Sequence, residues 1–165
     1  LKKNLFVINI DKLSYSANNY NLNIFNKKKY VFVKSDINNK KKIIKTLHKY
    51  KPSIVFNLAA ETHVDRSIDR PNPFIHSNIN GVFNLLESIR SYIKKTKKKL
   101  KLIHISTDEV YGDMLNVSKR ANEKYPYNPS SPYAASKASA DHLVKHVYCA
   151  HVGMETHAAF MRCVK

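Results

Sequence analysis

Residues 53–106 read SIVFNLAAETHVDRSIDRPNPFIHSNINGVFNLLESIRSYIKKTKKKLKLIHIS. The stretch opens with an apolar run of strand length, Ser53–Leu58, and closes with another, Leu102–Ser106. Between these runs, apolar residues recur every three or four positions, at Ile75, Ile79, Val82, Leu86, Ile89 and Ile93. This period predicts a long helix with one face on a core. A strand, a helix and a second strand in this order are typical of two parallel strands joined by a helical crossover.

The same alternation continues on both sides of this stretch. We expect further strands at Leu5–Ile10, Tyr30–Val33 and Thr156–Met161, and further helices at Lys40–Tyr50 and from Pro132 to about Val152. The polar, proline-containing residues 112–131 are interpreted as a loop. The predicted fold class is α/β, with a doubly wound, Rossmann-like parallel sheet. Because Ser53–Leu58 is almost wholly apolar, we expect that strand to be buried on both faces.

Composition limits the class of protein. The 165 residues suffice for one domain with a buried core, and 43% of them are hydrophobic. The sequence contains no apolar run close to the ~20 residues of a membrane span and no secretory signal pattern, so we expect a cytoplasmic protein without a membrane partner. Cys149 and Cys163 are too few for a disulfide framework, and we interpret both as reduced.

The net charge of +17 raises the question of a nucleic-acid partner. The charge comes from 24 lysines and only five arginines, in a chain that also has 17 asparagines. Arginine is the usual residue for base-edge and bidentate phosphate contacts, so we interpret the charge as a bias toward lysine and expect no nucleic-acid partner. A basic nucleic-acid-binding module on a decayed Rossmann scaffold remains the alternative that is not an enzyme.

Polar residues follow the predicted strands, which is where open parallel sheets bind ligands. These residues are Asp11, Asp36, Ala59–Thr62 and Thr107–Glu109. An acidic residue at the position of Asp11 can bind an adenosine ribose, although an ordinary turn residue is the simpler interpretation. The sequence has no G-x-G-x-x-G string, and its only glycines are Gly81, Gly112 and Gly153. The usual phosphate-binding turn is therefore absent from these residues.

Tyr133 and Lys137 form a Y-x-x-x-K pair near the start of the last predicted helix. Four helical residues place the two side chains on one face, about 6 Å apart along the axis. A nearby ammonium favours the phenolate and lowers the pKa of a tyrosine, so Tyr133 is a candidate base. The pair Tyr30 and Lys34 has the same spacing but falls on a strand, where the side chains are about 13 Å apart.

Two further groups carry ionisable side chains. Asp108 and Glu109 are adjacent carboxyl groups after a strand, and they are either an acid and base pair or a solvated turn. His142 and His146 have the i, i+4 spacing of metal ligands, but the sequence shows no obvious third ligand. We therefore predict no metal site.

Four segments together resemble a known family. They are INIDKLSYSANNYNL (8–22), NLAAETHVDRSID (57–69), ISTDEVYGD (105–113) and NPSSPYAASKASADHLVK (128–145). In order and spacing they are similar to the nucleotide-sugar branch of the extended short-chain dehydrogenases, and most of all to the dTDP-glucose 4,6-dehydratases. The resemblance covers residues 5–145. It implies a Rossmann domain that holds NAD, followed by a smaller sugar-nucleotide domain.

The resemblance also implies a lyase reaction and roles for five residues. Tyr133 would take the proton of the sugar 4-hydroxyl, Lys137 would bind the nicotinamide ribose, and Thr107 would bond the 4-oxygen. Glu109 would then remove the C5 proton, and Asp108 would protonate the departing 6-hydroxyl. The product would be the 4-keto-6-deoxy sugar nucleotide of deoxysugar and rhamnose biosynthesis.

The remaining residues that match the family pattern are expected around the cofactor. They are Asp11, Asp36, Ile37, Ala59, Ala60, Glu61, Thr62 and Asn78, together with Tyr133 and Lys137. Asn78 matches a family asparagine that supports the lysine. The residues alone leave open a second interpretation of Asn78, as a satisfied polar group between helices.

Several alternatives stay open. UDP-glucose is the second candidate substrate after dTDP-glucose, and a sibling epimerase or decarboxylase is a second candidate activity. By resemblance, residues 1–165 are one partial NAD-binding domain that lacks its first strand, its glycine loop and the substrate domain. We expect such a fragment to be inactive alone and the full-length protein to be a homodimer.

Overall fold

The computed structural model describes residues 5–15, 17, 28–113, 121–122, 124–148 and 156–161, the last six and 146–148 by their backbone only. The strands are β1 (Val7–Asp11), β2 (Tyr30–Lys34), β3 (Ile54–Asn57), β4 (Lys101–Thr107) and β5 (Thr156–Met161). The α-helices are α1 (Lys40–Tyr50), α2 (Val64–Asp69), α3 (Asn72–Phe74), α4 (Gly81–Thr96) and α5 (Pro132–His142). Wider π turns form η2 (Ile75–Asn80) and η4 (Leu143–Tyr148), and η3 (Asp108–Tyr111) is a 3₁₀ turn.

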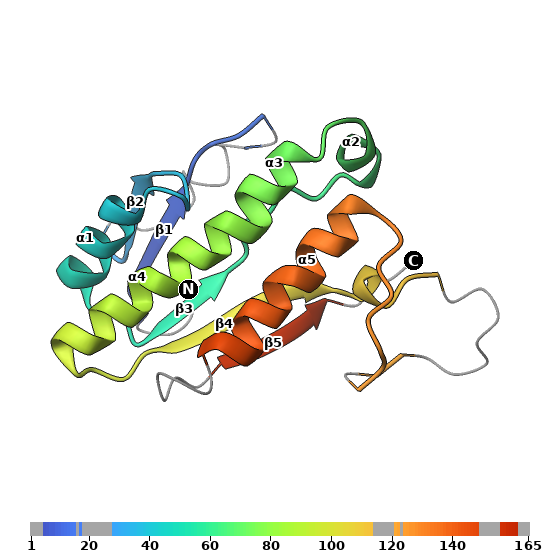
Figure 1. Ribbon diagram of the computed structural model, residues 1–165. Coiled ribbons are helices and arrows are strands. Elements are labelled where there is room, and N and C mark those ends of the chain that lie inside the picture. The colour runs from blue at the N-terminus through green and yellow to red at the C-terminus, as the bar shows by residue number, and fades with distance from the viewer. Residues whose placement is uncertain are drawn as a thin grey trace.

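The described strands form two parallel sheets, β1-β2 and β3-β4-β5 (Figure 1). In the larger sheet, Ile54 pairs with Lys101 and Leu102 pairs with Thr156. Parallel pairing brings the carboxyl ends of these strands to one edge, and the helices between them supply the crossovers. The α/β class with a parallel, Rossmann-like sheet is confirmed.

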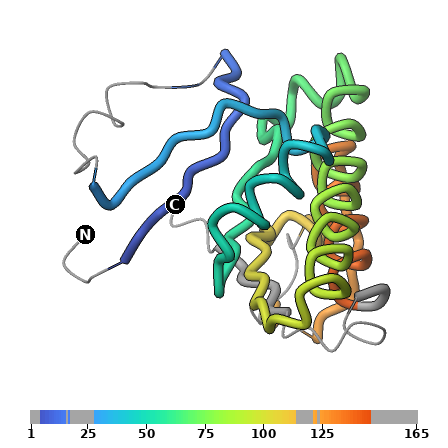
Figure 2. The backbone as a smooth tube through the Cα atoms, turned by 90° about the vertical axis from the view of Figure 1, so that its left-hand side faces the viewer, coloured from blue at the N-terminus to red at the C-terminus, as the bar shows by residue number. Residues whose placement is uncertain are grey.

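Helices α4 and α5 lie side by side on one face of the β3-β4-β5 sheet (Figures 1 and 2). The inner face of α4 carries Leu86, Ile89 and Tyr92, which are fully buried. These side chains pack in one core with residues of α1, β4, α5 and η4, namely Ile43, Leu47, Leu102, Ala140 and Val144. The 3.6-residue period that predicted the helix therefore marks the face on the core.

The expectation that the third strand is buried on both faces is wrong for the described structure. Side chains alternate along a strand, and in β3 Val55 and Asn57 face inward while Ile54 and Phe56 stay 47% and 58% exposed. The described helices α4 and α5 lie on one side of the sheet (Figure 2), and it is the side on which Val55 packs against their core. An apolar run therefore did not distinguish a strand covered on one face from a strand covered on two.

Element boundaries agree with the expectations within a few residues, with three differences. Helix α2 and the turn η3 were not predicted, because six and four residues are too short to show a period. The long helix begins at Asn72 and changes to a π turn over η2 before α4 continues it. The last helix is described to Tyr148, and the rest of its expected length, 149–152, lies outside the described residues. Within the described ranges, no helix combines the length and the apolarity that a bilayer crossing requires.

The core on α4 predicts a large loss of stability on truncation. Leu86→Ala should lower the free energy of unfolding by about 2–5 kcal/mol, because it removes a fully buried side chain and leaves a cavity. The control Lys94→Ala truncates an exposed residue of the same helix and should change that free energy by less than about 0.5 kcal/mol. Urea denaturation of both variants checks this, and equal losses would contradict the assignment of the core.

Candidate functional site

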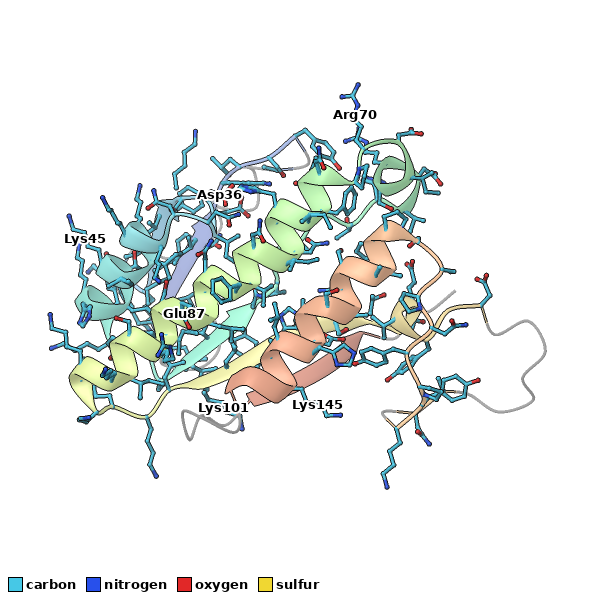
Figure 3. The ribbon with its side chains drawn as sticks, in the orientation of Figure 1. Asp36, Lys45, Arg70, Glu87, Lys101 and Lys145 are labelled. Atoms are coloured by element: carbon cyan, nitrogen blue, oxygen red, sulfur yellow. The ribbon has the colours of Figure 1, made fainter. Side chains whose placement is uncertain are left out.

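The residues predicted from strand ends do lie at the carboxyl edge of the sheets. Asp11 ends β1, where its carboxylate Oδ1 accepts the backbone N–H of Leu13 at 2.6 Å. Asp36 lies two residues beyond β2, and its Oδ1 accepts the backbone N–H of Asn38 at 2.7 Å. A backbone hydrogen bond from Ser35 to the carbonyl of Asp11 joins the two segments. Figure 3 shows Asp36 near the end of β1 and Arg70 extending from the tip of the α2 region.

The loop after β3, which contains Ala59, Ala60, Glu61 and Thr62, is held by a buried asparagine. Asn78 on η2 accepts the backbone N–H of Glu61 at 2.8 Å and donates to the carbonyl of Glu61 at 3.0 Å. Its second amide hydrogen goes to Ser136 Oγ on α5, at 2.9 Å. The side chain of Glu61 pairs with Lys12 at 2.8 Å, which ties the loop to the end of β1.

The contacts of Asn78 therefore match the interpretation as a satisfied polar group between elements. The Asn78 amide forms hydrogen bonds with the loop after β3 and with Ser136, the residue before Lys137. Both of its amide hydrogens are used. The amide thus connects the loop predicted for the cofactor with the helix that carries the Y-x-x-x-K pair.

Tyr133 and Lys137 lie on the buried face of α5. The helix begins at Ser131, whose Oγ caps the backbone N–H of Ala134 at 3.0 Å, with Pro132 in the first turn. Ser67 of α2 accepts the backbone N–H of Tyr133 at 3.0 Å. The Tyr133 ring is buried edge-on against Phe74, with 6.3 Å between the ring centres.

The ammonium of Lys137 is anchored on β4. Its Nζ donates to the carbonyl oxygen of Ile105 at 2.6 Å, and only 5% of the residue is exposed. Burial lowers the pKa of Lys137, and the carboxylate of Asp141, one helical turn further along α5, acts in the opposite direction. The helix and the sheet are thus joined by a charged side chain.

The end of β4 carries Thr107, Asp108 and Glu109, and the η3 turn begins there. Thr107 caps this turn, because its Oγ1 accepts the backbone N–H of Glu109 at 3.3 Å. Burial raises the pKa of the Glu109 carboxyl, and the neighbouring Asp108 raises it further. The η3 turn contacts α5, so the turn that carries this carboxyl group lies against the helix that carries the buried Lys137 and Tyr133.

Sequence reasoning missed a buried polar cluster beneath α5, which we call the Asp141 cluster. It consists of Asp141 with its neighbours Asn57, His104, Ser106 and Tyr127. Two signals were available. Asp141 follows Lys137 by four residues and so shares its helical face, and His104 and Ser106 alternate along β4, on the face toward α5.

A depression of about 550 Å³ borders the same edge. Its lining residues are Tyr15, Glu61, Arg66, Asp69, Arg70, Pro73 and Phe74. The guanidinium of Arg66 lies over the Tyr15 ring at 4.1 Å. Glu61 and Phe74 connect this depression to the loop after β3 and to Tyr133, but the buried groups of α5 do not line it.

A family model described as GDP-mannose 4,6 dehydratase matches residues 1–163. The chain belongs to this family. It is 48% identical over 145 residues to the dTDP-glucose 4,6-dehydratase of Haemophilus influenzae. The matched region covers 85% of this chain and 43% of that protein. The chain thus spans less than half the length of the curated relatives that it matches.

Solved structures of similar proteins have the same fold. The dTDP-glucose 4,6-dehydratase DesIV of Streptomyces venezuelae, solved with NAD and TYD bound, matches 96% of this chain and 46% of its own, with 31% identity and a TM-score of 0.85. The UDP-glucose 4-epimerase of Thermus thermophilus, in complex with NAD, matches 90% of this chain and 44% of its own, with 30% identity and a TM-score of 0.77. The fold is therefore shared by dehydratases and epimerases.

The buried histidine of the cluster predicts a pH dependence of stability. Burial, with a contribution from Lys137, lowers the pKa of His104 from its ordinary 6.5 to about 3. Between these values the unfolded chain binds a proton that the folded chain does not, so stability falls as the pH is lowered from 6.5 toward 3. His104→Gln should remove about 1.4 kcal/mol per pH unit from the slope of the unfolding free energy in this window.

Urea denaturation at several pH values checks the slope. The control Leu86→Ala lowers stability without removing a proton-binding group, so it should keep the wild-type slope. Curves for wild type and His104→Gln that run parallel between pH 6 and pH 4 would contradict the prediction.

Proposed function

We propose that this chain carries the catalytic residues and part of the NAD site of a dTDP-glucose 4,6-dehydratase. The observation that carries the proposal is the anchoring of Lys137, on the helix that also carries Tyr133, against β4, the strand that ends in Thr107 and leads directly into Asp108 and Glu109. The similarity to named dTDP-glucose 4,6-dehydratases at 40–48% identity supports it. The residues 1–165 are accordingly proposed to be part of one NAD-binding domain.

The residues at the strand ends fit the two ribose groups of NAD. Asp11 offers carboxylate oxygens at the end of β1, where a ribose can be bound, and Asp36 and Ile37 follow β2 on the same edge. The loop Ala59–Thr62 and the buried ammonium of Lys137 lie at the ends of the next two strands. The 165 residues contain no glycine-rich turn for the pyrophosphate, so these residues supply only part of such a site. NAD, when bound, would accept the hydride from C4 of the sugar and return it to C6 after water has left.

The oxidation half-reaction is assigned to α5 and Thr107. Tyr133 takes the proton of the sugar 4-hydroxyl, and Thr107 holds the 4-oxygen in place. The positive charge of Lys137 stabilises the phenolate of Tyr133, which is why the ammonium has to stay protonated inside the protein. The 4-keto group that results makes the C5 hydrogen acidic.

The elimination half-reaction is assigned to η3. Glu109 is the base for the C5 hydrogen, and its raised pKa makes it a stronger base than an ordinary carboxylate. Asp108, which is exposed, protonates the departing 6-hydroxyl as water. The adjacent positions of the two carboxyl groups allow one to act as base and the other as acid in the same step.

Partners and location follow the same proposal. A dTDP-hexose is the proposed substrate, the full-length protein is proposed to be a cytoplasmic homodimer, and no nucleic-acid partner is proposed. Because a UDP-glucose 4-epimerase has the same fold, a sibling activity such as epimerisation is the second candidate. The Asp108 and Glu109 pair favours the dehydratase, because an epimerase needs no group that eliminates water.

Glu109→Gln in the full-length protein separates these activities. We expect formation of the 4-keto-6-deoxy product to fall about 10²–10⁴-fold, while oxidation at C4 continues, because the amide cannot remove the C5 proton. Mass spectrometry of the sugar nucleotide measures the lost water, and the absorbance of reduced nicotinamide measures the oxidation. Tyr133→Phe should abolish both signals.

The control Glu87→Gln removes a carboxylate from α4 that pairs with Arg90 and should leave both signals at the wild-type level. Turnover of dTDP-glucose by Glu109→Gln at the wild-type rate would refute the dehydratase assignment. Turnover of UDP-glucose in preference to dTDP-glucose would replace the substrate but keep the reaction.

A further inference from the structure

The carboxylate of Asp141 is a buried charge that the proposed reaction does not use. The residue is only 2% exposed, and it follows Lys137 by one helical turn on α5. Its Oδ2 accepts hydrogen bonds from the hydroxyls of Ser106 and Tyr127, the second at 3.1 Å. Its Oδ1 faces the Nε2 atom of His104 at 3.4 Å.

A chain of hydrogen bonds decides which nitrogen of His104 carries the proton. The backbone N–H of Ala59 donates to Asn57 Oδ1 at 3.3 Å, so the amide nitrogen of Asn57 points to His104. That nitrogen is a donor and lies 3.0 Å from His104 Nδ1, which must then accept. The single proton of the neutral ring is therefore on Nε2, which lies 3.4 Å from Asp141 Oδ1 without a hydrogen bond between the two atoms.

Two hydroxyl groups donate hydrogen bonds to Oδ2 of Asp141, and the Nε2 atom of His104 lies 3.4 Å from Oδ1, which is near enough for attraction but not for a hydrogen bond. The two carboxylate oxygens only accept while the group is ionised. His104 and Ser106 lie on either side of Ile105, whose carbonyl holds the Lys137 ammonium. The lysine and the aspartate of α5 therefore dock on three consecutive residues of β4.

We propose that Asp141 is a positioning residue, the internal counter-ion that keeps Lys137 charged and seated on the carbonyl of Ile105. Through His104 and Asn57, the same cluster reaches the backbone of Ala59 in the loop that is proposed to contact the cofactor. This inference deepens the proposed function and rests on it in one respect only, namely that a charged Lys137 stabilises the phenolate of Tyr133.

The electrostatics of the pair are reciprocal. Burial lowers the pKa of Lys137 and raises the pKa of Asp141, so each group alone tends to become neutral. Asp141 raises the pKa of Lys137, while Ser106, Lys137 and Tyr127 lower the pKa of Asp141. Each charge therefore favours the charged form of the other, and removing one leaves the other buried without an opposite charge on the same helix face.

Within the described residues, five other titratable groups lie around Lys137 and Asp141. They are His104 on β4, Tyr127 before α5, Tyr111 on η3, and His142 and Tyr133 on α5 itself. Helices α2 and α3 and the turn η2 face α5 with Ser67, Phe74 and Asn78, which do not titrate. His104 is held neutral and Tyr127 has a raised pKa, so neither replaces Asp141 as an anion.

The full-length variant Asp141→Asn tests the inference by direct titration of Lys137. The ¹⁵N signal of Lys137 Nζ, assigned by its loss in Lys137→Met, reports when the ammonium loses its proton. We expect the acid dissociation constant of Lys137 to rise about tenfold or more, because a buried opposite charge one helical turn away has been removed. Asp141→Glu keeps the charge and should restore most of the wild-type value.

The activity of the same variants gives a second readout. In Asp141→Asn the alkaline limb of the pH profile for kcat/KM should move to lower pH, and a merely structural defect would lower the profile without moving its limbs. The control Glu87→Gln removes a carboxylate away from the cluster and should change neither readout. An unmoved Lys137 titration in a folded Asp141→Asn protein overturns the inference.

Lys137→Met decides the question if Asp141→Asn does not fold. Loss of the ammonium should raise the proton affinity of the Asp141 carboxyl, which ¹³C carboxyl shifts measure as a titration at higher pH. An Asp141 titration that is the same with and without Lys137 overturns the inference. Both titrations are independent of turnover, so absence of dehydratase activity with coupled titrations would reject the proposed function and keep the electrostatic coupling of Lys137 and Asp141.

Discussion

The seating of α5 on β4 is the interaction on which the candidate site depends. Lys137 donates to the carbonyl of Ile105, and Asp141 accepts from Ser106, so two opposite charges of the helix meet consecutive residues of one strand. Separating these groups would leave charges unpaired in a dry interface, which costs several kcal/mol. The orientation of the helix is thereby fixed more tightly than apolar contacts alone would fix it.

This docking also places the residues that the parallel strands bring to one edge. Thr107 and Glu109 follow β4 directly, so the strand that receives the lysine also presents the hydroxyl and the carboxyl group. Asn78 connects the loop after β3 to Ser136, which is adjacent to Lys137. The arrangement of the site residues is therefore set by the backbone at the ends of the neighbouring strands β3 and β4.

Long periodic elements and motif residues were predictable from the sequence, and the contacts between them were not. The helix Lys40–Tyr50 and the strand Thr156–Met161 have the predicted bounds, because an apolar period or run shows them directly. The Asp141 cluster was missed because its members are separated by up to 84 positions in the sequence, from Asn57 to Asp141, and each resembles an ordinary polar residue alone. Only the register of β3 on β4 and the seating of α5 bring them together.

The composition of α5 explains why two buried charges are possible there. Small residues stand on either side of Lys137 along the helix, and all of them are buried, namely Ala134, Ser136, Ala138 and Ala140. Small side chains let the helix approach the strand closely, so the ammonium reaches a backbone carbonyl at 2.6 Å. Leucines at these positions would bury more apolar area, but the larger side chains would not fit the present spacing between α5 and the elements around it. The helix therefore buries less apolar surface than larger side chains would bury, and it holds the Lys137 ammonium at a fixed position.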